Sequence, residues 1–280
     1  SRMVGVPGCL CASLVEPSRF ADGTVYVTFD AHRTGDYGSY LFASTDFGAT
    51  FKSIAGTLPK GEVARSITED QKNADVLYLG TETGLWVTLD RGQRWTRVRA
   101  NLPTVPVYEI TLHPRDNAMI LATHGRGIWI LDDLTPFQEG AKAQLADAHL
   151  YTLPPTEQQS AANLRFYFFQ GDMQYLGPNP PLGAPIRYWL KTRADSTRVA
   201  ITDGAGNLVR TLQGADMKDA ARTGMNSVLW DLRIEPIPAP KGDSIAQSSP
   251  FGGGGPNRGT QGPWVLPGPF TATLVVNGRQ

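Results

Sequence analysis

Three carboxylates are the side chains of this sequence best suited to acid–base chemistry. Asp30 and Asp36 lie in a polar segment between two apolar runs, and Glu82 lies in a short turn further along. Cleavage of a glycosidic bond needs two carboxylates about 5 to 10 Å apart, one on each side of the bond. No spacing pattern pairs these three, so they are candidate catalytic residues by location alone. For Glu82 the structural alternative is a solvated turn residue.

A second group of side chains suits the recognition of sugars or acidic ligands. An arginine can grip a carboxylate through two parallel hydrogen bonds, and an aromatic ring can stack on the apolar face of a ligand. For His124 and Arg126, the structural alternative is that they hydrogen-bond neighbouring strands or the carboxylates of Asp132 and Asp133. The candidate ligand-binding residues are His32, Arg33, Tyr37, His124 and Arg126.

Several other chemistries find no support in the sequence. The chain has no Gly-x-Ser-x-Gly motif, no cluster with metal-ligand spacing and no phosphate-binding loop, so we expect no metal and no cofactor. Cys9 and Cys11 are too close in sequence for an ordinary disulfide within one strand. Lys plus Arg and Asp plus Glu balance at 26 each, which disfavours nucleic-acid binding. An apolar run of about 20 residues, which a membrane span requires, is absent from the sequence.

A repeated turn motif organises the first half of the chain. Ser44–Phe51 returns as Thr88–Trp95, and its aspartate, glycine and aromatic residue recur at the same spacing. A period of about 40 to 50 residues in strands punctuated by glycine and aromatic residues is typical of β-propeller blades. The aspartate can accept hydrogen bonds from turn N–H groups, the glycine can adopt positive φ and the aromatic residue can return to the core. We therefore assign a structural role to the Asp-box residues Asp46, Gly48, Phe51, Asp90, Gly92 and Trp95.

More of each repeat aligns around the Asp-box. Residues 76–87 match residues 119–130 without a gap, and a shorter strand precedes each segment. Each repeat then predicts four antiparallel strands, with the Asp-box joining the third to the fourth. The last repeat loses the box after Asp133. We expect an all-β protein whose residues 1–136 form a partial β-propeller of about two and a half to three four-stranded blades, with further blades missing upstream.

The strand order assigns the candidate residues to one face. Successive turns of an antiparallel sheet lie at opposite ends of the strands, so the loops joining second and third strands lie opposite the Asp-box turns. These loops are residues 30–39, 81–83 and 123–126. They carry the candidate carboxylates and ligand-binding residues to a single rim.

The second half of the chain follows a different β pattern. A linker over residues 137–147 leads to short strands over residues 148–280, which predict a β-sandwich of immunoglobulin type. Residues 241–263, rich in Gly, Pro, Ser and Gln, predict a flexible loop with no core-forming power. Asn277-Gly278 favours a hairpin turn, so we expect a return strand beyond residue 280. The expected strands of this half are residues 149–153, 164–169, 186–191, 198–202, 208–212, 227–232 and 270–276.

The Asp-box and the run from His124-Gly125-Arg126-Gly127 to Asp132-Asp133 resemble the BNR, or Asp-box, repeat proteins over residues 15–135. That group includes sialidases, sortilin-type receptors, xyloglucan-cleaving glycosidases and bacterial proteins labelled glycosyl hydrolase. The segment from Asp203 to Gly268 resembles the FlgD-like immunoglobulin module that follows such propellers. The resemblance implies an extracellular or periplasmic protein. In the resembling glycosidases, the substrate cleft lies opposite the Asp-box turns.

The residues and the resemblance leave three functional hypotheses open. The first is a glycosyl-hydrolase-like propeller fragment that binds a glycan or a polypeptide at the propeller face. The second is a glycoside hydrolase with a carboxylate in residues 30–39, completed by blades upstream. The third is a sortilin-like or assembly-factor-like scaffold that grips a peptide. No catalytic residue is carried over by motif, because the sialidase arginine triad and tyrosine nucleophile have no place in this sequence.

Overall fold

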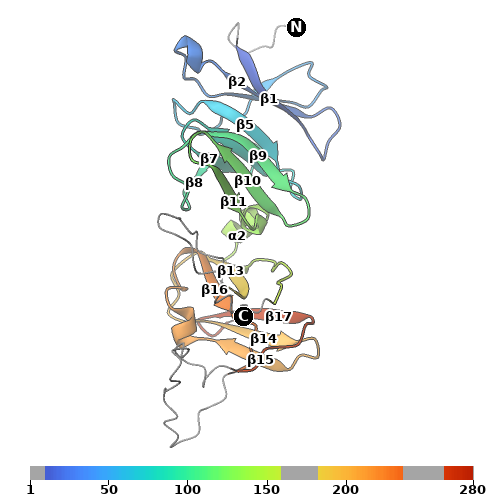
Figure 1. Cartoon of the computed structure of the whole chain (residues 1–280), viewed down its shortest axis with the longest axis vertical. Coiled ribbons are helices and arrows are strands. Elements are labelled where there is room, and N and C mark those ends of the chain that lie inside the picture. The colour runs from blue at the N-terminus through green and yellow to red at the C-terminus, as the bar shows by residue number, and fades with distance from the viewer. Residues whose placement is uncertain (1–9, 159–181, 236–261, 280) are drawn as a thin grey trace, which may run out of the picture. The chain divides into compact units, whose positions relative to one another are not determined.

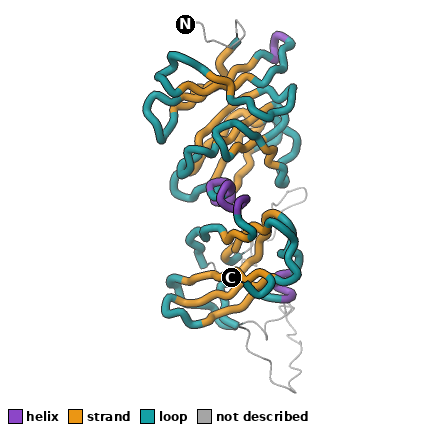
Figure 2. The backbone as a smooth tube through the Cα atoms, turned by 180° about the vertical axis from the view of Figure 1, so that it is seen from behind, coloured by secondary structure: helices purple, strands orange, loops and turns teal. Residues whose placement is uncertain are grey.

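Strands dominate the computed structural model, which describes residues 10–158, 182–235 and 262–279 (Figure 1). The chain divides into two compact units, Ser1–Lys142 and Ala143–Gln280. Figure 2 shows that helix is confined to a few short segments of the described chain, with loops and turns joining the strands. None of the helices among these residues is long and apolar enough to cross a membrane.

The N-terminal unit begins with two four-stranded antiparallel sheets of the same design. Sheet one has the order β1 (Cys11–Pro17), β2 (Val25–Asp30), β3 (Tyr40–Ser44) and β4 (Lys52–Ser53). Sheet two repeats this order with β5 (Ala64–Glu69), β6 (Leu77–Thr81), β7 (Leu85–Thr88) and β8 (Thr96–Val98). A short 3₁₀ helix, η1 (His32–Thr34), lies in the long loop between β2 and β3. Strands that pair in chain order form the meander of a propeller blade.

Sheet three is a shorter version of the same unit. It contains β9 (Val107–His113), β10 (Ala118–Thr123) and β11 (Ile128–Leu131), and the described residues supply no fourth strand. The chain enters α1 (Thr135–Gln138) and α2 (Gly140–Leu145) instead. The turn after β11 keeps one blade contact, because the Leu134 N–H donates to the Asn117 carbonyl as the Arg91 N–H donates to Asp75. The prediction of an all-β chain with a partial propeller of this size is confirmed.

Apolar side chains between adjacent sheets form the core of the N-terminal unit. Leu41 of sheet one and Ile67 of sheet two lie in one buried cluster. Leu85 of sheet two and Ile110 of sheet three lie in another. In each case the first strand of the later sheet packs on the sheet before it, β5 on β1 and β2, and β9 on β5 and β6. Burying such side chains stabilises the stack by about 1.5 to 3 kcal/mol each.

The turn between second and third strands differs in length between sheets two and three. The Thr81 N–H donates to the Gly84 carbonyl, whereas the Thr123 N–H donates to Gly127, one residue further along. The ungapped match of residues 76–87 to residues 119–130 is therefore wrong by one residue in β10. Because side chains alternate between faces, a slip of one residue exchanges the two faces of the strand. Leu121, not Ala122, takes the place of Leu79, and each pairs with a tryptophan of the third strand.

The C-terminal unit consists of two three-stranded antiparallel sheets. One has the order β12 (Ala148–Leu150), β13 (Ala184–Leu190) and β16 (Gly224–Trp230), and the other β15 (Leu208–Leu212), β14 (Thr197–Asp203) and β17 (Phe270–Val276), with a short 3₁₀ helix, η2 (Gly214–Met217), after β15. Side chains of both sheets, Ile186 and Val199 among them, share one buried core. Two sheets around one shared core form a β-sandwich, as the strand pattern predicts. The predicted strand 164–169 and nearly all of the Gly-rich loop 241–263 lie outside the described residues.

Candidate functional site

The aspartate of each Asp-box accepts hydrogen bonds from residues of its own turn. Asp90 accepts from the Thr88 hydroxyl and from the Arg94 N–H, each at 2.8 Å. Gly92 has a φ of 89°, and Trp95 is buried between sheets one and two. The first box repeats this arrangement at Asp46, Gly48 and Phe51, with Phe51 packed against the apolar cluster of sheet one. These contacts support the structural role predicted for the six box residues.

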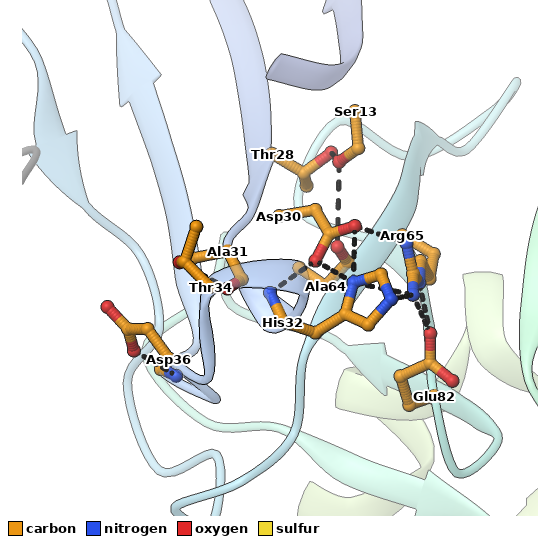
Figure 3. Close-up of polar contacts among 11 residues, drawn as sticks. Ser13, Thr28, Asp30, Ala31, His32, Thr34, Asp36, Ala64, Arg65 and Glu82 are labelled. Carbon is orange, nitrogen blue, oxygen red and sulfur yellow. Dashed lines mark hydrogen bonds and ion pairs between the residues drawn. The ribbon is translucent and has the colours of Figure 1, made fainter. Parts of the chain in front are cut away.

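Charged side chains meet around Arg65 at the opposite end of the strands (Figure 3). Asp30 ends β2, Glu82 lies in the turn between β6 and β7, and Arg65 lies in β5. The Arg65 guanidinium forms ion pairs with both carboxylates. Its side chain is only 11% exposed, and a cation this far out of water needs such partners. Arg65 thereby ties a loop of sheet one to a turn of sheet two.

His32 completes this group from the side of the long loop. Its backbone N–H donates to Asp30 Oδ1 at 2.9 Å, and its ring Nδ1 lies 2.6 Å from the same oxygen. Burial raises the pKa of the Asp30 carboxyl, but the hydrogen bonds from His32 and the charge of Arg65 lower that pKa by more, so it lies below its usual value. Asp30 is therefore ionised at neutral pH. A carboxyl with a lowered pKa is a poor general acid.

Two aromatic rings of sheet three extend the group. The Tyr108 ring lies over the guanidinium, with Arg65 Cζ 4.9 Å from its centroid. The His124 ring stacks on Tyr108 at a centroid distance of 5.2 Å and an interplanar angle of 29°. Tyr108 is 44% exposed. We call Asp30, His32, Arg65, Glu82, Tyr108 and His124 the Arg65 cluster. Since its members come from all three sheets, the cluster joins the three loops that the strand order places on one rim.

Arg65 and Tyr108 are members that the sequence analysis did not identify. Each is the extra residue of a β-bulge in the first strand of its sheet. Ser13 is the extra residue at the corresponding bulge of sheet one. A bulge leaves one residue out of the strand pairing and redirects its side chain, and such bulges are frequent next to functional sites. The sequence contains a signal for both residues. Arg65 and Tyr108 are separated by the same repeat distance as the apolar strand residues Ile67 and Ile110, so they occupy equivalent positions in their sheets.

The remaining candidates lie outside the cluster. Asp36 accepts hydrogen bonds from the Gly38 N–H at 2.9 Å and from the Tyr40 hydroxyl at 2.8 Å, and it lies apart from Arg65 in Figure 3. Its carboxylate thus orders its own loop. Arg33, Tyr37 and Arg126 are exposed. The structure therefore brings together Asp30, His32, Glu82 and His124 from the predicted set, and it leaves Asp36 away from the other two carboxylates.

A metal site and an apolar cavity are the other kinds of site that a chain of this kind could offer. Within the described residues no group of three or more His, Cys, Asp or Glu side chains could hold a metal ion. The C-terminal unit contains a cavity of about 740 Å³, lined mainly by apolar side chains such as Ile186, Ile201, Trp230 and Phe270. None of the predicted site residues lines it. The Arg65 cluster is therefore the candidate site.

Comparison with known proteins gives one family match and several distant structural similarities. A family model described as sortilin, neurotensin receptor 3, matches residues 39–143. No curated protein sequence matches the chain. Similar solved structures include the GH74 xyloglucanase from Xanthomonas campestris, at 16% identity and a TM-score of 0.33 over 44% of this chain and 22% of that one. Another is PorZ, an essential surface component of the type-IX secretion system of Porphyromonas gingivalis, at 14% identity and a TM-score of 0.35 over 78% and 26%.

A GH74 enzyme from Niastella koreensis is similar at 12% identity and a TM-score of 0.36, over 73% of this chain and 30% of that one. The chain thus spans less than a third of each of these structures. Similarity this distant identifies neither an activity nor a ligand. What the comparisons give is a likeness to the sortilin family over residues 39–143, which include β3 to β11 of the N-terminal unit.

Proposed function

We propose that the N-terminal unit belongs to a BNR-type β-propeller that binds a polypeptide or a glycan at the face bearing the Arg65 cluster. The observation that carries this proposal is the Tyr108–His124 stack, an exposed aromatic surface supported from below by a buried cation. Stacked rings of this kind offer a rigid, amphipathic surface at little conformational cost. Such a surface suits the apolar side of a sugar or of a peptide side chain.

The charges of the cluster favour binding over catalysis. Arg65 is already paired with Asp30 and Glu82, so it holds the loops in place instead of gripping a ligand. The exposed cations next to the cluster in sequence, Arg33 and Arg126, are the groups left to contact an acidic ligand. Direct contacts then come from Tyr37, Arg33, Tyr108, His124 and Arg126.

A glycoside hydrolase is the less supported alternative. One specific observation favours it, namely that Asp30 and Glu82 are two carboxylates from neighbouring sheets held by one guanidinium. However, a glycosidase needs one carboxyl that is protonated at the working pH. The pKa of Asp30 is lowered, which is the wrong direction for that task. Glu82 Oε1 accepts a hydrogen bond from the Arg65 guanidinium. The sortilin-type match over residues 39–143 favours a polypeptide ligand instead.

The wider assignments of this proposal rest on the resemblance of the motifs. They are an extracellular or periplasmic location, a FlgD-like identity for the C-terminal sandwich and further blades in a longer parent polypeptide. Detection of the native protein in culture medium or in a periplasmic extract would test the location directly. Its absence from both fractions would contradict it.

A binding screen with a matched control variant tests the proposed site. The immobilised chain is exposed to a peptide library and to a glycan array, and hits are titrated against Tyr108→Ala and Phe20→Ala. Phe20 is 46% exposed, close to the 44% of Tyr108, and lies in the turn between β1 and β2, at the Asp-box end. We expect Tyr108→Ala to weaken binding about tenfold, which is about 1.4 kcal/mol, and Phe20→Ala to bind like the wild type. Equal loss in both variants, or hydrolysis of a glycan with no retention, would overturn the proposal.

A further inference from the structure

Glu62 is a buried residue close to the Arg65 cluster, just before β5, and it is only 8% exposed. Its carboxylate accepts hydrogen bonds from the hydroxyl groups of Thr81 and Thr83, each at 2.7 Å. The Trp86 indole N–H donates to the same carboxylate at 3.3 Å. All three donors are uncharged side chains. They replace the water that a buried carboxylate would otherwise need.

The turn between β6 and β7 is held at three consecutive residues by the segment that leads into β5. Glu62 binds the residues on either side of Glu82. The Glu82 backbone N–H donates to the Val63 carbonyl at 3.1 Å. The Glu82 side chain pairs with Arg65, as Figure 3 shows. The hydrogen bonds of Glu62 therefore fix the turn from which Glu82 reaches Arg65.

The same segment also holds the long loop of sheet one. The Ser39 hydroxyl, at the far end of that loop, donates to the Glu62 backbone carbonyl at 2.7 Å. At the near end of the loop, Asp30 pairs with Arg65. Residues 62–65 therefore anchor the long loop at both ends together with the turn of sheet two. These are two of the three loops that form the rim.

Sheet three forms the equivalent turn without a carboxylate. The His124 N–H donates to the Pro106 carbonyl, which matches the backbone contact of Glu82. The residue before Pro106 is Val105, which is 3% exposed and takes the place of Glu62. A buried valine thus suffices for a sheet at this position, whereas a buried carboxylate costs free energy unless it is fully hydrogen-bonded. Departures of this kind from the simplest folding solution are typical of functional sites.

We propose that Glu62 is a positioning residue of the ligand-binding rim. Its hydrogen bonds hold the turn of sheet two in the conformation in which Glu82 pairs with Arg65, and Arg65 in turn lies under the Tyr108 ring. Glu62 acts through these neighbours and does not itself contact a ligand. Its effect on affinity rests on the proposed function, whereas its effect on the pairing of Glu82 with Arg65 does not.

Two matched substitutions in the full 280-residue chain test this role. Glu62→Val gives sheet two the residue that sheet three carries, and Glu62→Gln keeps the shape and one acceptor oxygen. Glu69→Leu is the matched control, made at the Asp-box end of β5. Glu69 is 1% exposed and accepts hydrogen bonds from Ser18 and Tyr26 of sheet one. Its counterpart in sheet three is Leu112.

Ligands from the binding screen are titrated against the wild type and the three variants. We expect Glu62→Val to weaken binding about fivefold to tenfold, because the turn is released. Glu62→Gln and Glu69→Leu should stay within about twofold of the wild type, although Glu69→Leu also leaves buried donors unpaired and lowers the melting temperature. Equal losses of affinity in Glu62→Val and Glu69→Leu would overturn the proposal, because they indicate a general effect of stability. Unchanged affinity in Glu62→Val would overturn it as well.

A measurement without ligand separates this role from the proposed function. The Arg65 Nε–H donates to Glu82 Oε1, so the hydrogen exchange of its NMR signal reports on that pair. We expect slow exchange in the wild type, Glu62→Gln and Glu69→Leu, and fast exchange in Glu62→Val. A chain that shows this pattern but binds no ligand would contradict the proposed function alone.

Slow exchange of the Arg65 Nε–H in Glu62→Val would overturn the positioning role even where a ligand is found. If Glu62→Val does not fold, Thr83→Val removes the same contact from the side of the turn. Thr83→Ser keeps the hydroxyl donor and is its control. The same criteria then apply, and a Thr83→Val variant with wild-type exchange at Arg65 would contradict the proposal.

Discussion

The two ends of the strands in the N-terminal unit differ in how their turns are held. At the Asp-box end, the hydrogen bonds of Asp46 and Asp90 close within one turn and recur from sheet one to sheet two. At the opposite end, Arg65 binds residues of two sheets and lies under a ring of the third. The repeated, self-contained contacts belong to folding. The surface that we propose for ligand binding lies at the end where the contacts around Arg65 occur only once.

Removing Arg65 should give the largest effect at the unrepeated end. Arg65→Ala leaves Asp30 and Glu82 as partly buried carboxylates without their cation, and we expect the free energy of unfolding to fall by about 3 kcal/mol. Arg65→Lys should recover only part of this loss, since an ammonium group cannot bind two carboxylates with one planar fork. Urea denaturation of the three proteins measures both differences. An Arg65→Ala variant as stable as the wild type would show that the cross-sheet pairing contributes nothing.

A smaller loss of stability is expected at the repeated end. Asp90→Ala removes the acceptor of the Thr88 hydroxyl and Arg94 N–H, and we expect a loss of about 1 to 2 kcal/mol in the free energy of unfolding. Ligand affinity should not change, because the box lies at the other end of the strands. Asp90→Asn retains an acceptor oxygen and serves as the control. A stable Asp90→Ala variant that no longer binds ligand would reverse the roles of the two ends.

Removing the outer ring of the stack should alter binding and leave folding intact. His124 is exposed and rests on Tyr108, so His124→Ala should change the melting temperature little while weakening ligand binding about threefold to tenfold. Isothermal titration with a ligand from the binding screen measures the affinity. Full affinity in this variant would remove His124 from the contact surface and leave Tyr108 alone in that role.

The pH dependence of stability should show the smallest effect. Hydrogen bonds from the Thr50 side chain and backbone, and from Ser44, lower the pKa of Asp46 to about 2. Because the folded-state pKa is below the ordinary value of 3.8, the contribution of Asp46 is fully present above that value and is lost as pH falls towards about 2. Asp46→Asn should flatten this part of the curve. Urea midpoints measured between pH 5 and pH 2 test the slope, and parallel curves for both proteins would contradict it.

The sequence predicts the repeated parts of this molecule well, because the aspartate of each Asp-box finds its hydrogen-bond partners within its own turn. The blade pattern, the strand order and the rim that collects the loops all follow from that local chemistry. Arg65 was not predicted, because its partners are distant in sequence: Asp30 is 35 residues away in sheet one, and Glu82 is 17 residues away in a turn of its own sheet. The ungapped match of residues 76–87 to residues 119–130 also misses the one-residue slip in β10. The turn at His124–Gly127 is one residue longer than its counterpart in sheet two, and only the hydrogen bonds of the turn and the register of β10 with β11 reveal it.

The first strand of each sheet in the N-terminal unit contains one β-bulge, and the three bulges differ in the side chain that they carry. Ser13, Arg65 and Tyr108 share one backbone geometry but carry a hydroxyl, a cation and an aromatic ring. Because a bulged residue stands outside the strand pairing, substitution there changes no register. Successive repeats can thus exchange chemistry at this position while the frame around it stays the same. Randomising Ser13 and Tyr108, with Arg65 kept to hold Asp30 and Glu82 in place, would be a compact way to evolve new ligand preferences on an unchanged propeller.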